Sequence, residues 1–376
     1  GLELNTRDML PTMSIEGNVG YARAVARDAD LANAVADIRQ LYIADSDINI
    51  TMADTTIVDD SAPVEWTIRL HKGRMKNCDI AVHIPHDTLS VAAHIGNLRL
   101  HGGRIDLATT DIALKSLALN GAYVKYDKGE RNAEEAPLDH IRFRDISLHA
   151  GNLRYAGIND ISAEISGLTL QQPGGIAITR AAMRLTSIND ILRLHWLEIE
   201  SRNGSRISSH AIIPHKALKD PDKEKLTATL TAGISKPDLA GFLPPQHYES
   251  LHWLNDSMLN ADLVLSGNIE DIAIDTLALQ IPGLGGLNAG GYIKHLPTAT
   301  ERKGRITFNA GIDDIKRFIG TPNDSIDGRT VAKGRITYDR GVMSTDVTLQ
   351  NASAEISAAG SYNIADTAYT ALVEID

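Results

Sequence analysis

Apolar and polar residues alternate along much of the chain, and the alternation is clearest over residues 263–293. Polar residues such as Ser266 and Asn268 occupy most of the gaps. A period of two predicts short β-strands with one apolar and one polar face. Turns are expected at Gly267-Asn268 and in the glycine-rich segment Pro282–Gly286. The apolar positions of this stretch are Leu263, Leu265, Ile272, Ile274, Leu277, Leu279 and Ile281.

A similar block returns over Ala332–Ile364, with a drift of a few residues in its spacing. Such self-similarity indicates a degenerate structural repeat, so we interpret the chain as variations on one hairpin unit. The matched pairs are Gly334 with Gly267, Ile336 with Ile269, Val347 with Leu277, Leu349 with Leu279, and Gly360 with Gly291.

Strands of about five to eight residues are expected along the rest of the chain. Ile38–Ile50 is interpreted as two strands around Ala44-Asp45-Ser46, and a turn is predicted at Lys72-Gly73. Residues 105–129 are interpreted as three strands with two turns between them. Two charged segments lack an apolar period and are predicted to be exposed loops: Lys128–Pro137 and Lys216–Lys225.

Two places break the strand rhythm, and both favour a short helix. Pro237–Leu243 has helical apolar spacing and is ended by proline, and Asp313–Ile319 is ended by glycine. In both places a strand runs directly into the predicted helix, which indicates equivalent points of a repeat of about 80 residues. Leu251–Leu259 is a candidate for a further short helix.

The fold class that follows is all-β: an elongated, repetitive, curled antiparallel sheet with a hydrophobic groove and a few short helices. Aromatic residues make up only 5% of the 376 residues, which suits a thin sheet better than a thick sandwich core. We expect trough repeats over residues 1–225 and again over 226–376, the latter as two units, 226–300 and 301–376. The chain starts and stops within strand-like sequence, so we expect a fragment of a longer protein.

The charge balance and the motifs exclude several functions. A net charge of −11 argues against nucleic acid as a partner and against electrostatic docking to an anionic membrane. The single cysteine, Cys78, is interpreted as a bystander thiol, and His83, His86, His94 and His101 as exposed strand residues rather than metal ligands. Gly283–Gly291 lacks the spacing of a phosphate-binding loop and is interpreted as a bulged turn. We therefore predict no catalytic residue, no metal, no cofactor and no enzymatic activity.

The apolar stripe is the one candidate for function. Two interpretations stay open: a core covered by a second sheet, or the lining of a groove wide enough for an acyl chain. A curled sheet has one concave face, and a period of two sends alternate side chains to it. The predicted groove-lining residues are Leu263, Leu265, Ile269, Ile272, Ile274, Leu277, Leu279, Ile336, Val347 and Leu349.

Four phrases carry a resemblance to a known family: Leu117–Gly129, Ile146–Leu170, Ser187–Pro214 and Ile234–Pro244. With them, most of the chain from about Ile38 onward resembles the periplasmic region of the TamB-like proteins of Bacteroidetes, in the AsmA-like superfamily. The resemblance implies a periplasmic β-trough. In the full-length protein it implies an N-terminal inner-membrane helix and a C-terminal domain near the outer membrane.

The resemblance also implies a function. The expected activity is to carry phospholipids, by their acyl chains, along the groove between the inner and outer membranes in support of outer-membrane biogenesis. The alternative is a non-enzymatic scaffold or chaperone for the translocation and assembly of outer-membrane proteins, with an outer-membrane barrel partner of the TamA type. An enzyme and a surface-exposed β-solenoid adhesin are more distant alternatives. Sequence does not separate the first two, because both need an apolar groove.

Overall fold

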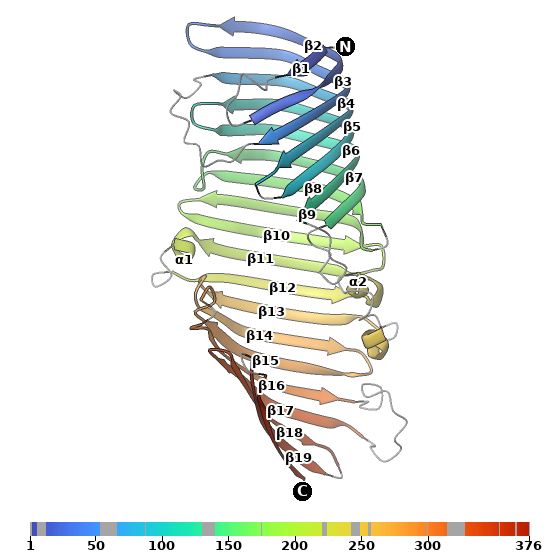
Figure 1. Ribbon diagram of the computed structural model, residues 1–376, viewed down its shortest axis with the longest axis vertical. Coiled ribbons are helices and arrows are strands. Elements are labelled where there is room, and N and C mark those ends of the chain that lie inside the picture. The colour runs from blue at the N-terminus through green and yellow to red at the C-terminus, as the bar shows by residue number, and fades with distance from the viewer. Residues whose placement is uncertain are drawn as a thin grey trace. The chain divides into compact units, whose positions relative to one another are not determined.

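The computed structural model of the chain is almost entirely β-structure, with 77% strand and 4% helix. The strands belong to one open, mixed sheet of 20 strands, which confirms the predicted all-β class (Figure 1). The structure describes residues 2–5, 13–52, 66–86, 88–129, 140–173, 175–219, 224–241, 249–254, 257–298, 300–313, 328–352, 354–364 and 367–375.

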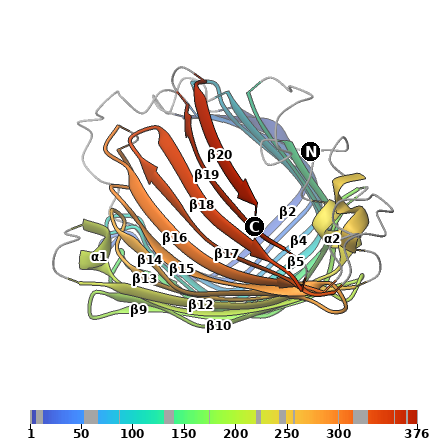
Figure 2. The same cartoon turned by 90° about the horizontal axis from the view of Figure 1, so that it is seen from below.

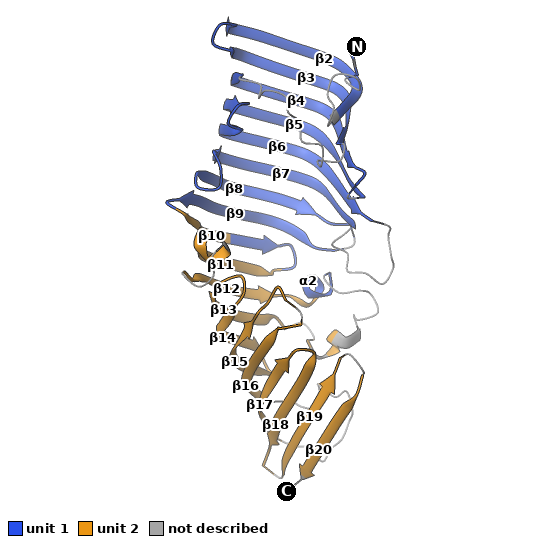
Figure 3. Cartoon of the chain, turned by 60° about the vertical axis from the view of Figure 1, so that its left-hand side comes forward, with its two compact units in different colours: residues 1–189, 198–203, 237–246 blue, residues 190–197, 204–236, 247–376 orange. Residues whose placement is uncertain are grey.

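The chain divides into two compact units (Figure 3). Unit 1 comprises residues 1–189, 198–203 and 237–246, and unit 2 comprises residues 190–197, 204–236 and 247–376. The strands of unit 1 are β1 (Leu2–Asn5), β2 (Met13–Asp30), β3 (Val35–Met52), β4 (Thr67–Ile84), β5 (Leu89–Asp106), β6 (Asp111–Lys128), β7 (His140–Tyr155), β8 (Ile161–Gln171) and β9 (Ala177–Ile188).

Most of the strands of unit 2 are shorter than those of unit 1. They are β11 (Arg206–Pro214), β12 (Leu226–Ile234), β13 (Leu259–Gly267), β14 (Ile272–Ile281), β15 (Gly285–Lys294), β16 (Lys303–Ile312), β17 (Thr330–Asp339), β18 (Val342–Gln350), β19 (Glu355–Asn363) and β20 (Tyr369–Ile375). Strand β10 (Ile191–Ser201) has residues in both units.

The strands of unit 1 are far longer than the alternation predicted. Each of β2, β3, β4, β5 and β6 has 18 residues. The turns predicted at Ala44-Asp45-Ser46 and at Lys72-Gly73 are wrong, because these residues lie inside β3 and β4. The second of the two turns predicted within residues 105–129 is wrong as well, since β6 continues through it.

At the first of these apparent turns, Asp45 occupies a position left out of the ladder, and such positions line up across neighbouring strands. Ala44 pairs with Lys76 and Ser46 with Cys78, so that Asp45 and Asn77 are both left out of the ladder. The same column continues through β5 and β6 at Gly96 and Gly121. We call Asp45, Asn77, Gly96 and Gly121 the first crease.

The crease needs residues that tolerate the left-handed conformation. Asp45, Asn77 and Gly121 have φ of 52°, 54° and 67°, a region open to Gly and, at modest cost, to Asn and Asp. The Asn77 side chain also donates a hydrogen bond to Asp45 Oδ1 at 2.8 Å. An extra residue in each strand bends it, and alignment of the extra residues bends the whole sheet along one line.

The few buried residues of unit 1 include those beside this crease. Cys78 is completely buried, and Ala44, Ser46 and Ala122 are nearly so. The Cys78 thiol donates to the Lys76 carbonyl oxygen at 3.4 Å. A second column of residues left out of the strand ladders crosses the same strands. Its members are Arg39, His71, Gly102 and Lys115.

One pairing departs from the predicted antiparallel sheet: β3 pairs with β4 in parallel. All the other ladders with a determined register are antiparallel, including β4 with β5 and β11 with β12. Parallel neighbours cannot be joined by a tight hairpin, so a longer connection is required between them. The chain between β3 and β4 includes residues 53–65, which lie outside the described part.

Three short helices lie within the described residues: α1 (His215–Lys219), α2 (Lys236–Ala240) and the 3₁₀ helix η3 (Glu249–Leu254). Helix α2 falls where Pro237–Leu243 predicted one, with Pro237 in its first turn, where proline is tolerated. Helix α1 corrects the prediction of a loop over Lys216–Lys225. All of the helix predicted at Asp313–Ile319 except Asp313, and most of the loop at Lys128–Pro137, fall outside the described residues.

The glycine-rich segment Gly283–Gly291 is mostly strand, so its interpretation as one bulged turn is wrong. Only Gly283 and Leu284 belong to the turn. Residues 285–291 all pair with β16, and all of them except Gly290 also pair with β14. A Cβ atom on Gly285 or Gly291 would lie 2.1 or 2.0 Å from a backbone oxygen of β16. Glycine is required here because the neighbouring backbone approaches so closely.

No second layer covers the sheet among the described elements. Apart from the contact of α1 with β11, the more extensive contacts between described elements all join strands that pair side by side. Leu254 and Leu284 are the largest fully buried side chains. The interpretation of the apolar stripe as a core beneath a second sheet is therefore wrong for the described part.

An ion pair at the end of β6 leads to a prediction of pH dependence. A hydrogen bond from Lys125, and a smaller contribution from His140, lower the pKa of Asp127. A lowered pKa means that Asp127 stabilises the fold above its unfolded pKa of about 3.9, and that this contribution is lost as pH falls through the folded pKa. We expect Asp127→Asn to lower the thermal midpoint at pH 7 and to have a smaller effect at pH 3. An equal shift at both pH values would contradict this assignment.

Candidate apolar groove

Strand register assembles an apolar face in unit 2 from residues that lie far apart in sequence. Residues directly opposite each other on paired strands project from the same face. One row of direct partners crosses nine strands, and every member is apolar or glycine: Leu230, Leu263, Leu277, Ala289, Phe308, Gly334, Val347, Ala358 and Val373.

Two further rows run beside it on the same face. We call the three rows together the apolar face. One comprises Ala232, Ala261, Leu279, Leu287, Ala310, Ala332, Leu349 and Ile356. The other comprises Ala228, Leu265, Ile274, Gly291, Ile306, Ile336, Thr345, Gly360 and Ala371, in which a threonine is the one polar member.

The structure brings nine of the ten predicted groove residues to this face. Eight of them belong to the three rows, and Ile272 extends the face through its pairing with Ile293. Ile269 is different: it lies in the turn between β13 and β14, and its side chain is 39% exposed. Its backbone N–H donates to the carbonyl oxygen of Ala217 in α1, so the turn contacts that helix rather than contributing to the rows.

A bulge explains how Ile274 and Leu277 share a face although three positions separate them. Leu265 pairs with Ile274 and Val264 with Thr276, which leaves Asp275 out of the ladder. The extra residue restores the alternation, so Ile272 and Ile274 before the bulge project with Leu277 and Leu279 after it. Asp275 and Thr276 remain exposed.

The opposite face of unit 2 is polar. The row beside Leu279 runs through Thr231, Asp262, Ala278, Asn288, Asn309, Lys333, Thr348, Ser357 and Glu374. Thr231 donates to Asp262 at 2.8 Å. The residues of the apolar face on β13 and β14 are less exposed than most of their polar neighbours, and the strands that carry them are curved (Figure 2). Exposure rises toward the C-terminal strands, to 37% at Ile336 and 59% at Val373.

The apolar face contains a hollow of about 310 Å³. Leu279 lies in its wall, Leu284 from the turn before β15 closes one side, and almost no polar atom is exposed in it. A volume of this size equals roughly ten water-sized groups, and an apolar hollow gains more from hydrocarbon than from water. Its lining residues are Leu259, Leu279, Ile281, Leu284, Gly285, Gly286, Leu287, Ala310, Gly311 and Ile312.

Unit 1 builds an apolar face in the same way. One row of direct partners crosses six strands from β3 to β8 and comprises Ile43, Met75, Leu98, Leu119, Leu148 and Leu168. A second row, beyond the first crease, comprises Ile48, Ile80, Ala93, Val124 and Phe143. Sequence reasoning did not assign these residues, because the bulges interrupt the period of two within each strand.

No helix in the part of the chain that the structure describes has the length and apolar character to cross a bilayer. Comparison of the chain with known protein families, with curated proteins and with solved structures finds no match. The chemistry of the site therefore has to be argued from its own residues. The apolar face offers hydrocarbon contact without fixed hydrogen-bonding groups, which suits an acyl chain or an apolar polypeptide segment.

Proposed function

We propose that this chain carries phospholipids by their acyl chains along the apolar face, as part of a periplasmic bridge between the inner and outer membranes. The observation that carries the proposal is the uncovered, continuous apolar face of unit 2. The TamB-like resemblance of the sequence supplies the setting: the periplasm, an inner-membrane anchor in the full-length protein, and an outer-membrane barrel partner of the TamA type.

The energetics of the face suit transport better than tight binding. Each methylene removed from water gains about 0.8 kcal/mol, so a long acyl chain is held by many small contributions. Because the rows repeat from strand to strand, a chain that moves by one strand exchanges one set of contacts for a similar set. The hollow at Leu279 is a place where the contacts are more enclosed than on the open face.

The second candidate is a scaffold for outer-membrane proteins in transit. A half-exposed apolar face also suits the alternating apolar side chains of a β-strand that has not yet been inserted. The two candidates predict different occupants of the same surface. They are therefore separated by identifying what lies against it.

The test is photo-crosslinking at two adjacent positions of β13. Leu263 lies on the apolar face, whereas Val264 projects from the polar face and is 36% exposed. We expect a photoreactive residue at Leu263 to crosslink to phospholipid in the bacterial envelope, detected by mass spectrometry, and the same residue at Val264 to give little lipid adduct. Both variants carry the same photoreactive side chain in place of an aliphatic one, so they are matched in chemistry.

Each outcome has a definite meaning. Lipid adducts at Leu263 alone support transport by the apolar face. Adducts between Leu263 and outer-membrane proteins, without lipid, favour the scaffold and contradict the lipid proposal. Equal lipid adducts at both positions would show nonspecific contact with membranes and would overturn the assignment of the apolar face.

A further inference from the structure

The polar face of unit 1 carries a cluster of cations, although the whole chain has a net charge of −11. Alternate residues Lys72, Arg74 and Lys76 of β4 project from this face, and Arg99 and His101 lie opposite on β5. All five side chains are exposed. We call these five residues the basic patch.

Within the described residues, no ion pair joins the Lys and Arg side chains of the basic patch to a carboxylate. Arg74 contacts the Tyr42 ring at 5.9 Å and donates to Asn97 at 3.2 Å, both neutral partners. Arg74 and Arg99 lie directly opposite each other, an arrangement of like charges that destabilises a sheet. Such a pair becomes favourable when an anion lies between or beside the two charges.

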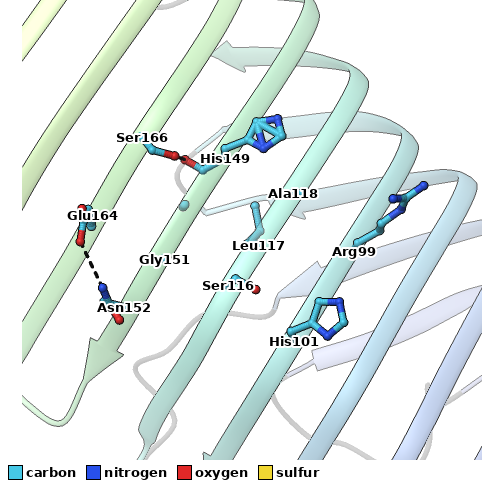
Figure 4. Close-up of a pocket in the computed structure, with 11 residues that line it drawn as sticks. Arg99, His101, Ser116, Leu117, Ala118, His149, Gly151, Asn152, Glu164 and Ser166 are labelled. Atoms are coloured by element: carbon cyan, nitrogen blue, oxygen red, sulfur yellow. Dashed lines mark hydrogen bonds between the residues drawn. The ribbon is translucent and has the colours of Figure 1, made fainter.

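A trench lies beside the basic patch on β5 to β8, with a volume of about 540 Å³ (Figure 4). Small residues form its floor: Ser116, Ala118 and Gly151 are direct partners of the larger side chains that flank them. Arg99 and His101 stand along one side of the floor, as Figure 4 shows.

The opposite wall differs in character. It combines His149 and Ser166 with Glu164, whose carboxylate accepts a hydrogen bond from the Asn152 side chain at 3.1 Å (Figure 4). Ala118 is paired with Arg99 on one side and with His149 on the other, so two strand spacings, roughly 10 Å, separate the two walls. A group placed over Ala118 is within reach of both long side chains.

We propose that this trench binds the phosphate group of a hydroxyl-bearing phosphate ester, of the glycerol phosphate or sugar phosphate class. A tetrahedral anion accepts hydrogen bonds in several directions, which suits donors on two walls and a hydroxyl on the floor. Arg99 supplies a forked guanidinium, and Ser116 supplies the hydroxyl between the walls.

The far wall defines the remainder of the ligand. The Glu164 carboxylate accepts hydrogen bonds from hydroxyl groups, and its negative charge disfavours a second phosphate at that end. The ligand is therefore anionic at the Arg99 side and neutral and hydroxylated at the Glu164 side. This chemistry occurs in free phosphate esters and in the headgroups of glycerophospholipids, and the experiment distinguishes these two sources.

The experiment titrates the chain with glycerol 3-phosphate and with glycerol by calorimetry, and measures its cosedimentation with phosphatidylglycerol and phosphatidylcholine vesicles. We expect glycerol 3-phosphate to bind and glycerol not to bind. Binding only to phosphatidylglycerol vesicles would assign the phosphate to a lipid headgroup, and binding only to glycerol 3-phosphate would assign it to a free ester. Either result supports the site.

The decisive variant is Arg99→Gln combined with His101→Gln, which we expect to weaken binding by at least about tenfold. Its thermal midpoint should stay the same or rise, because it removes the repulsion between Arg74 and Arg99. The matched control is Arg335→Gln, which removes an exposed arginine from the polar face of unit 2 opposite Asp346. Binding by this control should match that of the wild type.

Three results would overturn the proposal. One is equal affinity of the wild type and of the Arg99→Gln, His101→Gln double variant for glycerol 3-phosphate or for phosphatidylglycerol vesicles. Another is the absence of binding to both glycerol 3-phosphate and phosphatidylglycerol vesicles at millimolar phosphate. The third is tighter binding of a single-stranded oligonucleotide that is lost in the same variant, because it would assign the basic patch to a polyanion rather than to a single phosphate ester.

Discussion

Replacing Leu279 by aspartate should eliminate most of the phospholipid that crosslinks to the apolar face beside it. Leu279 lies between Ala261 and Leu287 in its row and forms part of the wall of the hollow. A polar group placed in such surroundings without a hydrogen-bond partner costs roughly 2–7 kcal/mol. An acyl chain that passes this point would have to share the hollow with a carboxylate, so we expect at least about a tenfold loss of lipid adduct at a crosslinker placed at Leu263.

The control is Thr276→Asp, three residues earlier on the same strand but on the polar face. Thr276 is exposed and pairs with Val264, so a carboxylate there remains in water. Its lipid adducts should equal those of the wild type. Circular dichroism and hydrogen exchange would establish that both variants are folded. Equal crosslinking in two folded variants would mean that lipid does not pass along this row.

The second large effect concerns Gly285, the first residue of β15. Its φ is 145°, and a Cβ atom there would lie 2.1 Å from the carbonyl oxygen of Gly311. The backbone conformation alone costs a residue with a side chain on the order of 1–3 kcal/mol, and relief of the clash requires the strands to separate. We expect Gly285→Ala to lower the thermal midpoint of unit 2 and to reduce hydrogen-exchange protection in β14, β15 and β16.

Gly290→Ala provides the comparison within the same strand. A Cβ atom at Gly290 would make only ordinary contacts, the nearest at 3.4 Å to the Ile274 carbonyl oxygen. A compatible Gly→Ala change alters stability by less than about 1 kcal/mol and often increases it, because the unfolded chain loses freedom. If both alanine variants behaved alike, close approach of β16 would not be the reason for glycine at position 285.

Part of this architecture follows directly from the sequence. The alternation of Leu263, Leu265 and Leu277 with polar residues is sufficient to predict strands and a face, because the period of a strand is fixed by its geometry. The prediction also placed Ile274 and Leu277 on one face, although the apolar positions change from even to odd numbers between them. Apolar character identifies the face on both sides of the bulge. Ile269 was wrongly assigned to the groove. It keeps the two-residue spacing of Leu263 and Leu265, although it lies in the turn that follows their strand.

The creases could not be predicted in the same way. Asp45, Asn77 and Gly121 are residues typical of turns, and a turn and an aligned bulge use the same left-handed conformation. Only the pairing of neighbouring strands distinguishes the two, because a bulge continues the ladder and a turn reverses it. The sequence around each bulge does not determine which residues of a neighbouring strand it pairs with.

The basic patch shows a related gap between composition and structure. The total charge of −11 suggested that no local concentration of cations was available. Lys72, Arg74 and Lys76 alternate with Gly73 and Met75 on one strand, and Arg99 joins them from another. Net charge is a sum over the chain, whereas an anion responds to the charges within about 10 Å of it.

Because the creases are aligned, different features of the sequence set the cross-section of unit 1 and its length. Each of β3, β4, β5 and β6 has one residue of the first crease left out of the ladder, so each of these strands repeats the same bend. The length of unit 1, in contrast, depends only on how many strands are added side by side. Gain or loss of an antiparallel hairpin among these strands would then change the length of unit 1 while leaving its cross-section unchanged.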